Sequence, residues 1–482
     1  MTTLASPAVD KVVIVVFDGL RPDMIVGRMP FLESFAKRAT WFREARSVFP
    51  SVTRVATTSF ATGSWPGAHG ILNNAFHQSQ VRTDRAIDTG NPDDLRLAEE
   101  RLGGLVTATS LGQTLASAGR RMGAVHCGTG GAAWLVNHCV AANGHWTFSV
   151  HGEEATQTPK AVRQATDLLG PLPGKEIPKF EVLRYAQRVM EQIALGPDQP
   201  DVSLVWLPEP DTSFHYREIG SDPTREVMAA ADAVFAGIVA EVERGPHAER
   251  TAIIAMSDHG QITITGAVDL PALLSDAGLR AASAPAPGVD LLYTGGNSGE
   301  LRLIDPDPRL AARAAGALME RDEIGMVFVR DDLVSGIPGA LPLSLVHHTH
   351  ARSPELFYVM RSDERPDHRG IPGRTVCSGG PPVGGGMHGG LNRYEMNTVL
   401  MISAPGMERG LVTSSPCGLI DIAPTVLDLL GEEQSTMQGR SLRCDLAPGT
   451  TEEHSAAHGG FAQVLERRSI AGRSYLQQGG RA

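Results

Sequence analysis

The stretch KVVIVVFDG (residues 11–19) decides the fold that we expect for this chain. Residues 12–17 form an unbroken apolar run rich in β-branched side chains, which is typical of a strand buried on both faces of a parallel sheet. Asp18 and Gly19 end this run, so a carboxylate stands at the carboxyl end of the strand. An unpaired buried carboxylate is costly and needs a metal ion, an arginine or backbone donors. Taken alone, Asp18 fits a structural cap as well as a functional site.

Strand-like and helix-like segments alternate along the rest of the chain. Segments with apolar residues at helical spacing lie between short apolar runs, and small or turn-forming residues separate them. Repeated βα units of this kind predict an α/β protein with a doubly wound, mostly parallel central sheet and helices on both faces. We expect strands at 12–17, 202–207, 251–256 and 399–402, and helices at 29–39, 53–62, 179–195, 225–242, 308–320 and 420–430.

The βα pattern divides the chain into a core and additions to it. We expect residues 1–262 and 380–445 to form the catalytic core. Residues 263–379 are rich in Gly, Pro and Ala and are expected to form an inserted cap or lid, with extra edge strands and surface loops as the alternative. Residues 446–482 are expected to be a C-terminal tail, and a stretch at about 91–174 also interrupts the repeat.

Composition excludes several classes of protein. A chain of 482 residues can bury a large core. The net charge of −11 argues against coating a nucleic acid, although bound metal ions would still let an acidic protein hold phosphate. The 5 cysteines include no CxxC pair, which argues against a zinc ribbon or a disulfide scaffold. The first residues, MTTLASPAVDK, resemble neither a signal peptide nor a membrane span, so we expect a cytoplasmic protein.

Polar residues that bind metals well recur where strands are expected to end. They lie in FDG (17–19), FPSVTR (49–54), LPEPDTSFH (207–215), MSDHG (256–260) and GGGMHGG (384–390). An open α/β sheet gathers such residues at the carboxyl edge of its strands. Three Asp, three His and one hydroxyl suffice for two divalent ions, most simply zinc. The candidate metal ligands are Asp18, Thr53, Asp211, His215, Asp258, His259 and His388.

Thr53 is the candidate nucleophile of this set. It stands where a helix is expected to begin, so free backbone N–H groups would face a bound anion. A metal ion on its oxygen would lower the pKa of the hydroxyl. An ordinary helix N-cap is the plain alternative, since threonine often has that role. Ser51, Thr57 and Thr58 are competing hydroxyls that spacing alone does not dismiss.

The order of these motifs resembles the alkaline phosphatase superfamily. The most similar branch is the nucleotide pyrophosphatase/phosphodiesterase family, with phosphonoacetate hydrolase as a near relative. The resemblance covers residues 10–76, 200–262 and 385–432, and it is specific in FPSVTR and in TGSWPGAHGILNN (62–74). In the family the nucleophilic Thr precedes an Asn by 21 residues. Asn74 follows Thr53 by 21 residues here, which favours Thr53 over its neighbours.

The resemblance implies a hydrolase of phosphodiester or pyrophosphate bonds that works through a phosphothreonine on Thr53. It implies that Asn74 and the Thr53 amide donate hydrogen bonds to a phosphoryl oxygen. The expected partner is a small phosphate ester or phosphonate, and the expected cofactors are two divalent metal ions, most simply zinc. One ion would be held by Asp18, Thr53, Asp258 and His259, and the other by Asp211, His215 and His388.

The residues after Thr53 depart from the family pattern. The family has an aromatic residue, Pro and Asn there, whereas this chain has Arg54, Val55 and Ala56. Loss of the aromatic residue weakens the case for a nucleotide, because an aromatic ring would help to stack a base. Arg54 either pairs with an anionic leaving group or is a solvated arginine at a helix start. A phosphonate or phosphomonoester hydrolase is therefore the alternative, and a non-catalytic binder of phospho-ligands is a remote one.

Two further segments contain residue types that are common in binding sites. The Gly-rich segment 126–134 could line the pocket but lacks the Gly-Lys-Ser/Thr ending of a P-loop. The tract HHTH (347–350) suggests metal binding, but we expect it to be an exposed loop. A sulfatase is disfavoured because no Cys stands at the nucleophile position.

Overall fold

An eight-stranded sheet lies at the centre of the computed structural model, which describes residues 7–434, 436–444 and 446–482. β1 pairs in parallel with β8 and β9, and β6 pairs in parallel with β7 and β8, whereas β20 runs antiparallel to its neighbours. The prediction of a mostly parallel, doubly wound sheet is therefore confirmed. In order across the sheet the strands are β21 (Val412–Thr413), β2 (Thr40–Phe42), β20 (Leu400–Ser403), β9 (Thr251–Met256), β1 (Lys11–Phe17), β8 (Val202–Leu207), β6 (Met122–His126) and β7 (Trp146–Ser149).

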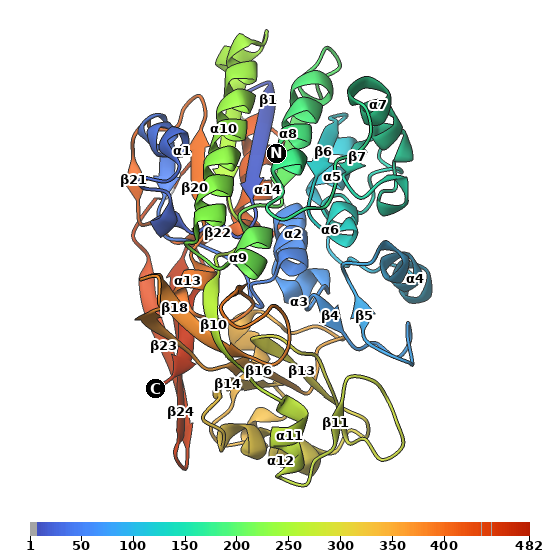
Figure 1. The fold of residues 1–482 in the computed structure, drawn as a ribbon, viewed down its shortest axis with the longest axis vertical. Coiled ribbons are helices and arrows are strands. Elements are labelled where there is room, and N and C mark those ends of the chain that lie inside the picture. Colours follow the sequence, from blue (N-terminus) through green and yellow to red (C-terminus); the bar gives the residue numbers. More distant parts are fainter. Residues whose placement is uncertain (1–6, 435, 445) are drawn as a thin grey trace.

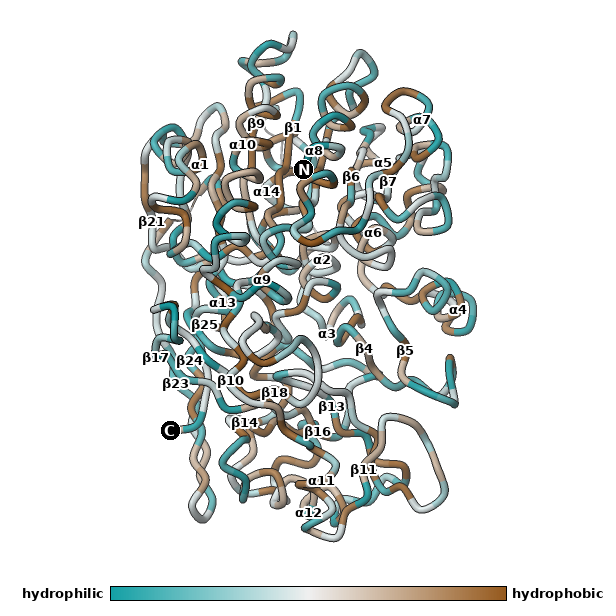
Figure 2. The backbone as a smooth tube through the Cα atoms, viewed as in Figure 1, coloured by the Kyte–Doolittle hydropathy of each residue, from teal (hydrophilic) through white to brown (hydrophobic). Residues whose placement is uncertain are grey.

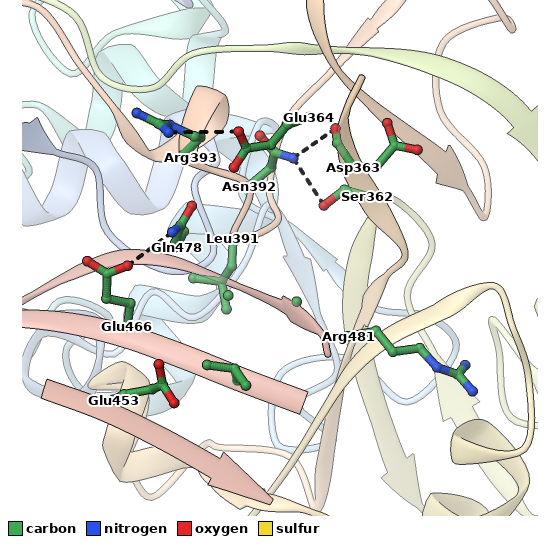
Figure 3. A pocket seen from close by; sticks show the side chains of 13 residues that line it. Ser362, Asp363, Glu364, Leu391, Asn392, Arg393, Glu453, Glu466, Gln478 and Arg481 are labelled. Carbon is green, nitrogen blue, oxygen red and sulfur yellow. Dashed lines mark hydrogen bonds and ion pairs between the residues drawn. The ribbon is translucent and has the colours of Figure 1, made fainter. Parts of the chain in front are cut away.

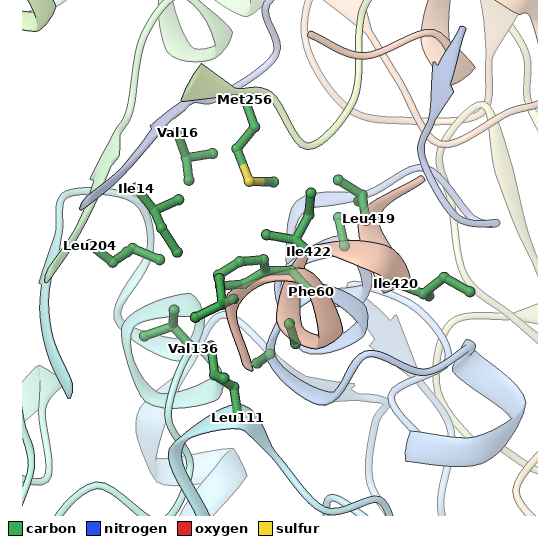
Figure 4. Close-up of a cluster of buried hydrophobic side chains, with 14 of the residues drawn as sticks. Ile14, Val16, Phe60, Leu111, Val136, Leu204, Met256, Leu419, Ile420 and Ile422 are labelled. Carbon is green, nitrogen blue, oxygen red and sulfur yellow. The ribbon is translucent and has the colours of Figure 1, made fainter. Parts of the chain in front are cut away.

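The apolar run of β1 is continuous because both of its faces are buried. Ile14 and Val16 point into one apolar cluster, while Val13, Val15 and Phe17 belong to another on the opposite face. Figure 4 shows part of the first cluster, to which helix α2 and helix α14 contribute. Burying one such side chain stabilises the fold by roughly 1.5–3 kcal/mol. Figure 2 shows apolar residues along these central strands.

Helices cover both faces of the central sheet (Figure 1). Residues of α2 (Thr53–Thr62), α5 (Leu111–Ser117), α6 (Gly130–Leu135) and α14 (Ile422–Leu430) lie in the first cluster. Residues of α1 (Pro30–Phe35), α7 (Pro159–Leu169), α8 (Phe180–Val189) and α10 (Asp222–Arg244) lie in the second. The remaining α-helices outside the insert are α3 (Pro66–His69), α4 (Pro92–Leu102), α9 (Asp211–Arg217) and α13 (Arg393–Met396). Among the described residues, no helix is long and apolar enough to cross a membrane.

The segment at about 91–174 does not interrupt the sheet, so that prediction is wrong. It contributes β6 and β7, which extend the central sheet beyond β8. These strands have 5 and 4 residues, and they include Gly123, His126 and Thr147 among their apolar positions. Their apolar signal is weak because they are short and mixed, and their place in the sheet depends on pairing with a strand far away in the sequence.

Residues 263–379, which we expected to be an inserted cap, contain a sheet of their own. It has six strands in the order β11-β12-β13-β16-β14-β15, and a separate apolar cluster lies between it and the helices α11 and α12. In Figure 1 this layer lies below the central sheet. The elements are α11 (Leu270–Ser275), β11 (Ala281–Ala282), β12 (Leu291–Tyr293), β13 (Ser298–Leu303), α12 (Pro308–Met319), β14 (Ile324–Val329), β15 (Leu341–Pro342) and β16 (Leu356–Met360).

A four-stranded sheet joins this insert to the core. Its order is β17 (Ser362–Pro366), β18 (Pro372–Cys377), β10 (Ile262–Ala267) and β19 (Gly386–Met387). β10 leads into the insert and β18 leads out of it, and the two strands lie side by side in parallel. β19 pairs with the other edge of β10, so the chain returns to the core next to the point where it left.

The expected C-terminal tail, 446–482, contains a three-stranded antiparallel sheet. It consists of β23 (Thr450–His458), β24 (Phe461–Ile470) and β25 (Arg473–Arg481). The Gln463 side chain hydrogen-bonds the backbone of Val327 in β14, and Tyr475 Oη donates to Asp421 Oδ1 at 3.0 Å. The last segment therefore contacts both the insert and the core. A surface pocket of 260 Å³ lies beside this sheet, with Glu466 bound to Gln478 in its wall (Figure 3).

Candidate active site

The predicted ligands lie together at the carboxyl edge of the central sheet. Asp18 follows β1, and Asp258 and His259 follow β9. Asp211 and His215 lie on α9, which follows β8. Thr53 is the first residue of α2, and His388 follows β19. The contacts given below join all seven residues into one group.

One half of this group surrounds the Thr53 hydroxyl. His259 Nε2 lies 3.1 Å from Asp258 Oδ2, 3.6 Å from Asp18 Oδ1 and 3.2 Å from Thr53 Oγ1. Ligand atoms of Asp18, Asp258 and His259 all lie within 4.8 Å of one another, and all three side chains are buried. Two carboxylates, an imidazole and a hydroxyl therefore converge on one point.

The other half is centred on Asp211. Asp211 Oδ1 lies 3.3 Å from His215 Nε2 and 3.5 Å from His388 Nε2. Ligand atoms of Asp211, His259 and His388 also lie within 4.8 Å of one another. The rings of His259 and His388 are stacked with their centroids 3.6 Å apart, so His259 lies between the two halves.

Backbone carbonyls orient all three histidines. Nδ1 of His215 lies 2.7 Å from Gly386 O, Nδ1 of His388 lies 2.8 Å from Ser51 O, and Nδ1 of His259 lies 3.2 Å from Gly260 O. A carbonyl oxygen only accepts, so each Nδ1 carries a proton, and in the neutral ring each Nε2 presents a lone pair to the group. This arrangement is typical of histidines that bind a metal ion.

Two buried carboxylate oxygens confirm that these residues fit a cation. Asp18 Oδ2 accepts from Trp206 Nε1 at 2.9 Å, and Asp258 Oδ1 accepts from Gly19 N at 3.1 Å. Their other oxygens, Asp18 Oδ1 and Asp258 Oδ2, are buried without a hydrogen-bond partner. Burial, followed by the charges of Asp258 and Asp211, raises the pKa of Asp18 well above its usual range. A positive ion among these carboxylates would remove both penalties.

Hydrogen bonds separate Thr53 from the competing hydroxyls. Thr57 Oγ1 donates to Thr53 O at 2.7 Å, Thr58 Oγ1 donates to Arg54 O at 2.8 Å, and Ser51 Oγ donates to Gly390 O at 3.0 Å. Thr53 Oγ1 contacts His259 Nε2 instead of a carbonyl. The N-cap of α2 is Val52, so Thr53 does not have the plain capping role.

Asn74 lies against the start of the same helix. Its Oδ1 accepts from Arg54 N at 3.3 Å, which leaves its Nδ2 group as a donor. Its backbone N–H donates to Asn73 Oδ1 at 2.8 Å. The structure therefore places Asn74 at the start of α2, although 21 residues separate it from Thr53 in the sequence.

Two residues that sequence reasoning missed contact the metal-ligand group. Trp206 donates to Asp18 Oδ2, and Gln261 donates through Nε2 to the Asp211 carboxylate. Trp206 lies in an apolar strand, where an indole is expected in any core, so no local signal marks it. In the Gly-rich segment, His126 stacks on Trp206 at 5.2 Å and lies one ring behind Asp18.

The prediction that the HHTH tract is exposed is wrong for His348. This side chain is buried, with Nε2 2.9 Å from Leu72 O and its ring 5.0 Å from that of Phe357. His347 stacks on Trp65 with ring centroids 4.2 Å apart. The tract belongs to the insert and packs against the core, a contact that local polarity does not reveal.

Fold and site together define a metal-dependent hydrolase with an alkaline phosphatase-like fold. Residues 12–369 match the family model of type I phosphodiesterase / nucleotide pyrophosphatase. Because this match spans most of the chain, the protein belongs to that family and is a phosphoric ester hydrolase. The predictions of the family and of the enzyme class are confirmed.

Solved structures with the same fold come from mouse and human. Murine ectonucleotide pyrophosphatase/phosphodiesterase 5 aligns with a TM-score of 0.62 and 14% identity over 89% of this chain and 97% of that one. An inactive variant of the murine protein in complex with AMP gives 0.61 and 14% over 90% and 97%. The human protein gives 0.61 and 14% over 89% and 97%. A search of curated proteins finds no match to this chain.

Proposed function

We propose that this protein hydrolyses phosphodiester or pyrophosphate bonds of small molecules through a phosphothreonine intermediate on Thr53. One observation carries the proposal. The Thr53 hydroxyl lies 3.2 Å from His259 Nε2, next to buried carboxylate oxygens that no other group satisfies. A hydroxyl in such surroundings is suited to act as an activated nucleophile.

The donor set suits two zinc ions. Asp18, Thr53, Asp258 and His259 would hold one ion, and Asp211, His215 and His388 would hold the other, because imidazole and carboxylate are ligands that zinc takes. When bound, such ions supply positive charge that lowers the pKa of a hydroxyl or water and stabilises charge on a phosphoryl group.

The chain itself supplies the nucleophile and the donors. Thr53 Oγ attacks phosphorus, loses its proton, and the alcohol or phosphate leaves opposite to it. Asn74 Nδ2 and the backbone N–H of Thr53, at the start of α2, donate to the phosphoryl oxygens. Water then displaces Thr53 from phosphorus, which releases phosphate or a phosphate monoester and restores the hydroxyl.

A specific observation favours a second candidate function. Arg54 stands where the family pattern has an aromatic residue, so the chain lacks a ring there to stack a base. This difference favours a phosphonate or a phosphomonoester as substrate. The AMP complex of the murine relative supports a nucleotide instead.

The Thr53→Ala variant tests the proposal. We expect it to retain about two zinc ions per chain but to lose nearly all turnover of p-nitrophenyl phosphate esters. Thr57→Ala is a matched control on the same helix, and we expect it to remain active because its hydroxyl is bound to a carbonyl. Full activity of Thr53→Ala would refute the nucleophile assignment.

A substrate panel ranks the two candidate functions. The panel compares release of p-nitrophenol from a bis-ester, a monoester and a phosphonate ester, and release of acetate from phosphonoacetate. Fastest cleavage of the bis-ester supports the phosphodiesterase. Faster cleavage of the monoester or of a phosphonate supports the alternative.

A further inference from the structure

Arg54 is half-buried and differs from the buried arginines Arg21 and Arg46 in its partners. Arg21 Nη2 and Arg46 Nη2 each lie 2.6 Å from a carboxylate, of Asp23 and Glu44 respectively. Arg54 forms no ion pair with any residue that the structure describes, and its buried Nε has no hydrogen-bond partner. A buried guanidinium nitrogen without a partner carries a cost, which an anion paired with the guanidinium would offset.

The backbone around Arg54 is fixed. Its N–H donates to Asn74 Oδ1 at 3.3 Å, and its carbonyl accepts from Thr58 Oγ1 at 2.8 Å. The residue is the second of α2, directly after Thr53. The Cα and Cβ atoms of Arg54 therefore cannot move without displacing Asn74 or Thr53.

Gly90 lies close to both the guanidinium of Arg54 and the carboxylate of Asp88. A Cβ added at Gly90 would lie 3.5 Å from Arg54 Nη2 and 3.6 Å from its Cζ. Gly90 is itself held in place, because its N–H donates to Asp88 Oδ1 at 2.8 Å and its carbonyl accepts from Gly131 N at 2.9 Å. The guanidinium thus lies between the nucleophile helix and a fixed loop.

Three carboxylates act on Arg54, and the one with the largest effect, Asp88, lies outside the metal-ligand group. The carboxylates that act on it are those of Asp88, Asp18 and Asp211. Asp88 is exposed and screened by water, whereas Asp18 and Asp211 are assigned to metal ions in the proposed function. Burial lowers the pKa of Arg54 from its usual value.

We propose that Arg54 binds a second anionic group of the substrate, located on or beside the reacting phosphorus. This inference rests on the proposed function and narrows it. The planar fork of the guanidinium matches a phosphate or carboxylate with two parallel hydrogen bonds. The substrate class is therefore a phosphoryl compound with at least two negative charges: a pyrophosphate, a phosphomonoester or a phosphonocarboxylate. Diesters with neutral substituents would not use Arg54.

A kinetic comparison tests the assignment on the zinc-loaded protein. The reference substrate is methyl p-nitrophenyl phosphate, which carries one negative charge. Three test substrates carry a further charge in different places: p-nitrophenyl phosphate on the reacting phosphorus, ADP on the neighbouring phosphate, and phosphonoacetate on a carboxylate. The measured quantity is kcat/KM of each test substrate divided by that of the reference.

We expect Arg54→Met to lower this ratio by about 10- to 100-fold for the substrate whose charge Arg54 meets. The substrate with the largest drop identifies the source of the anionic group. Arg54→Lys keeps the charge but not the fork, and we expect it to restore part of the ratio. Arg184→Met is the matched control, because Arg184 is exposed on α8 and paired with Glu181. A drop of equal size for all four substrates, or no drop, would overturn the inference.

A binding measurement separates this inference from the proposed function. In the Thr53→Ala background, calorimetry compares the dissociation constants of p-nitrophenyl phosphate, ADP and phosphonoacetate with that of the methyl diester. We expect the added Arg54→Met change to weaken at least one charged ligand about 10-fold more than the diester. If the wild-type protein hydrolyses none of the four substrates, the proposed function fails, and this measurement still decides the role of Arg54. Equal weakening of all four ligands would count against it.

Discussion

The buried carboxylate of Asp421 and the buried carboxylates of the metal-ligand group have opposite surroundings. Asp421, where the core meets the C-terminal sheet, has both oxygens satisfied: Oδ1 accepts from Arg440 N and Tyr475 Oη, and Oδ2 accepts from Gly418 N. Asp18 and Asp258, at the carboxyl edge of the central sheet, each have one buried oxygen with no partner. Burial raises the pKa of Asp421 to about 6 and that of Asp18 well above its usual range.

This difference distinguishes a carboxylate with a structural role from carboxylates with a functional role. An unsatisfied buried polar group costs about 1–3 kcal/mol, so a chain retains one only where something else offsets the cost. Asp421 connects parts of the fold and needs no ligand. Asp18 and Asp258 each keep one oxygen without a hydrogen bond, which suits them to an ion. Four substitutions test this difference.

Asp258→Asn should have the largest effect. The amide oxygen of the variant would still accept the hydrogen bond from Gly19 N. The substitution would remove one negative charge from the site. We expect turnover to fall by about 1,000-fold or more, since several kcal/mol of transition-state stabilisation depend on the metal site. In chelator, the same change should raise the melting temperature, because the buried charge of Asp258 no longer repels that of Asp18. A lower melting temperature of the metal-free variant would contradict the contrast.

Asn74→Ala should follow in size. Its Nδ2 group is the donor that the hydrogen bond from Arg54 N leaves free for a phosphoryl oxygen. Removing one such donor typically lowers kcat by about 100- to 1,000-fold. Metal content, measured by elemental analysis, should not change. A loss of zinc would show instead that Asn74 supports the structure of the metal site.

Trp206→Phe should act on metal affinity more than on turnover at saturating metal. It removes the indole N–H that fixes Asp18 Oδ2, and loss of such a partner typically weakens metal binding about 10- to 100-fold. Trp41→Phe is the matched control, because the buried Nε1 of Trp41 has no hydrogen-bond partner. Competition with a zinc chelator measures both variants. Equal affinities would show that the indole does not orient Asp18.

Asp421→Asn should have the smallest effect, confined to stability and its pH dependence. The folded-state pKa of about 6 lies above the ordinary 3.8, so the stabilisation from this group is present below pH 3.8 and lost as the pH rises through 6. The Asp421→Asn variant has no carboxyl group to ionise at this position, so it does not lose stability in this way. Between pH 4 and pH 7, the excess stability of the wild type over the variant should shrink by about 2 kcal/mol. Urea denaturation of the metal-free proteins measures it, and parallel pH profiles would contradict the prediction.

Sequence reasoning succeeded where the signal is local. The β-branched run before Asp18 predicts a central strand because burial on both faces imposes an unbroken apolar pattern. The helix of 10 residues from Thr53 ends at Gly63, which has a φ of 57°, as its small residues and final glycine indicate. Expected helices at 225–242 and 308–320 correspond to α10 and α12 with shifted ends.

The same reasoning failed where a role depends on distant contacts. The strands β6 and β7 have too few apolar residues to be recognised, and pairing with β8 makes them part of the sheet. Trp206 and His348 acquire their roles from Asp18 and Leu72, which no local pattern links to them. The metal assignment of each ligand, the division at 263–379 and the cytoplasmic location stay predictions.

The pairing of β10 with both β18 and β19 has a consequence for how the site tolerates change. His259 and His388 are separated by the whole insert in sequence, yet their rings are stacked. The chain enters and leaves the insert through adjacent strands. The pairing of these strands sets the spacing of the two histidines, and the length of the insert does not. A segment whose ends are held side by side can be lengthened at little entropic cost. The insert is therefore a region where the chain can acquire new surface while the two histidines keep their places.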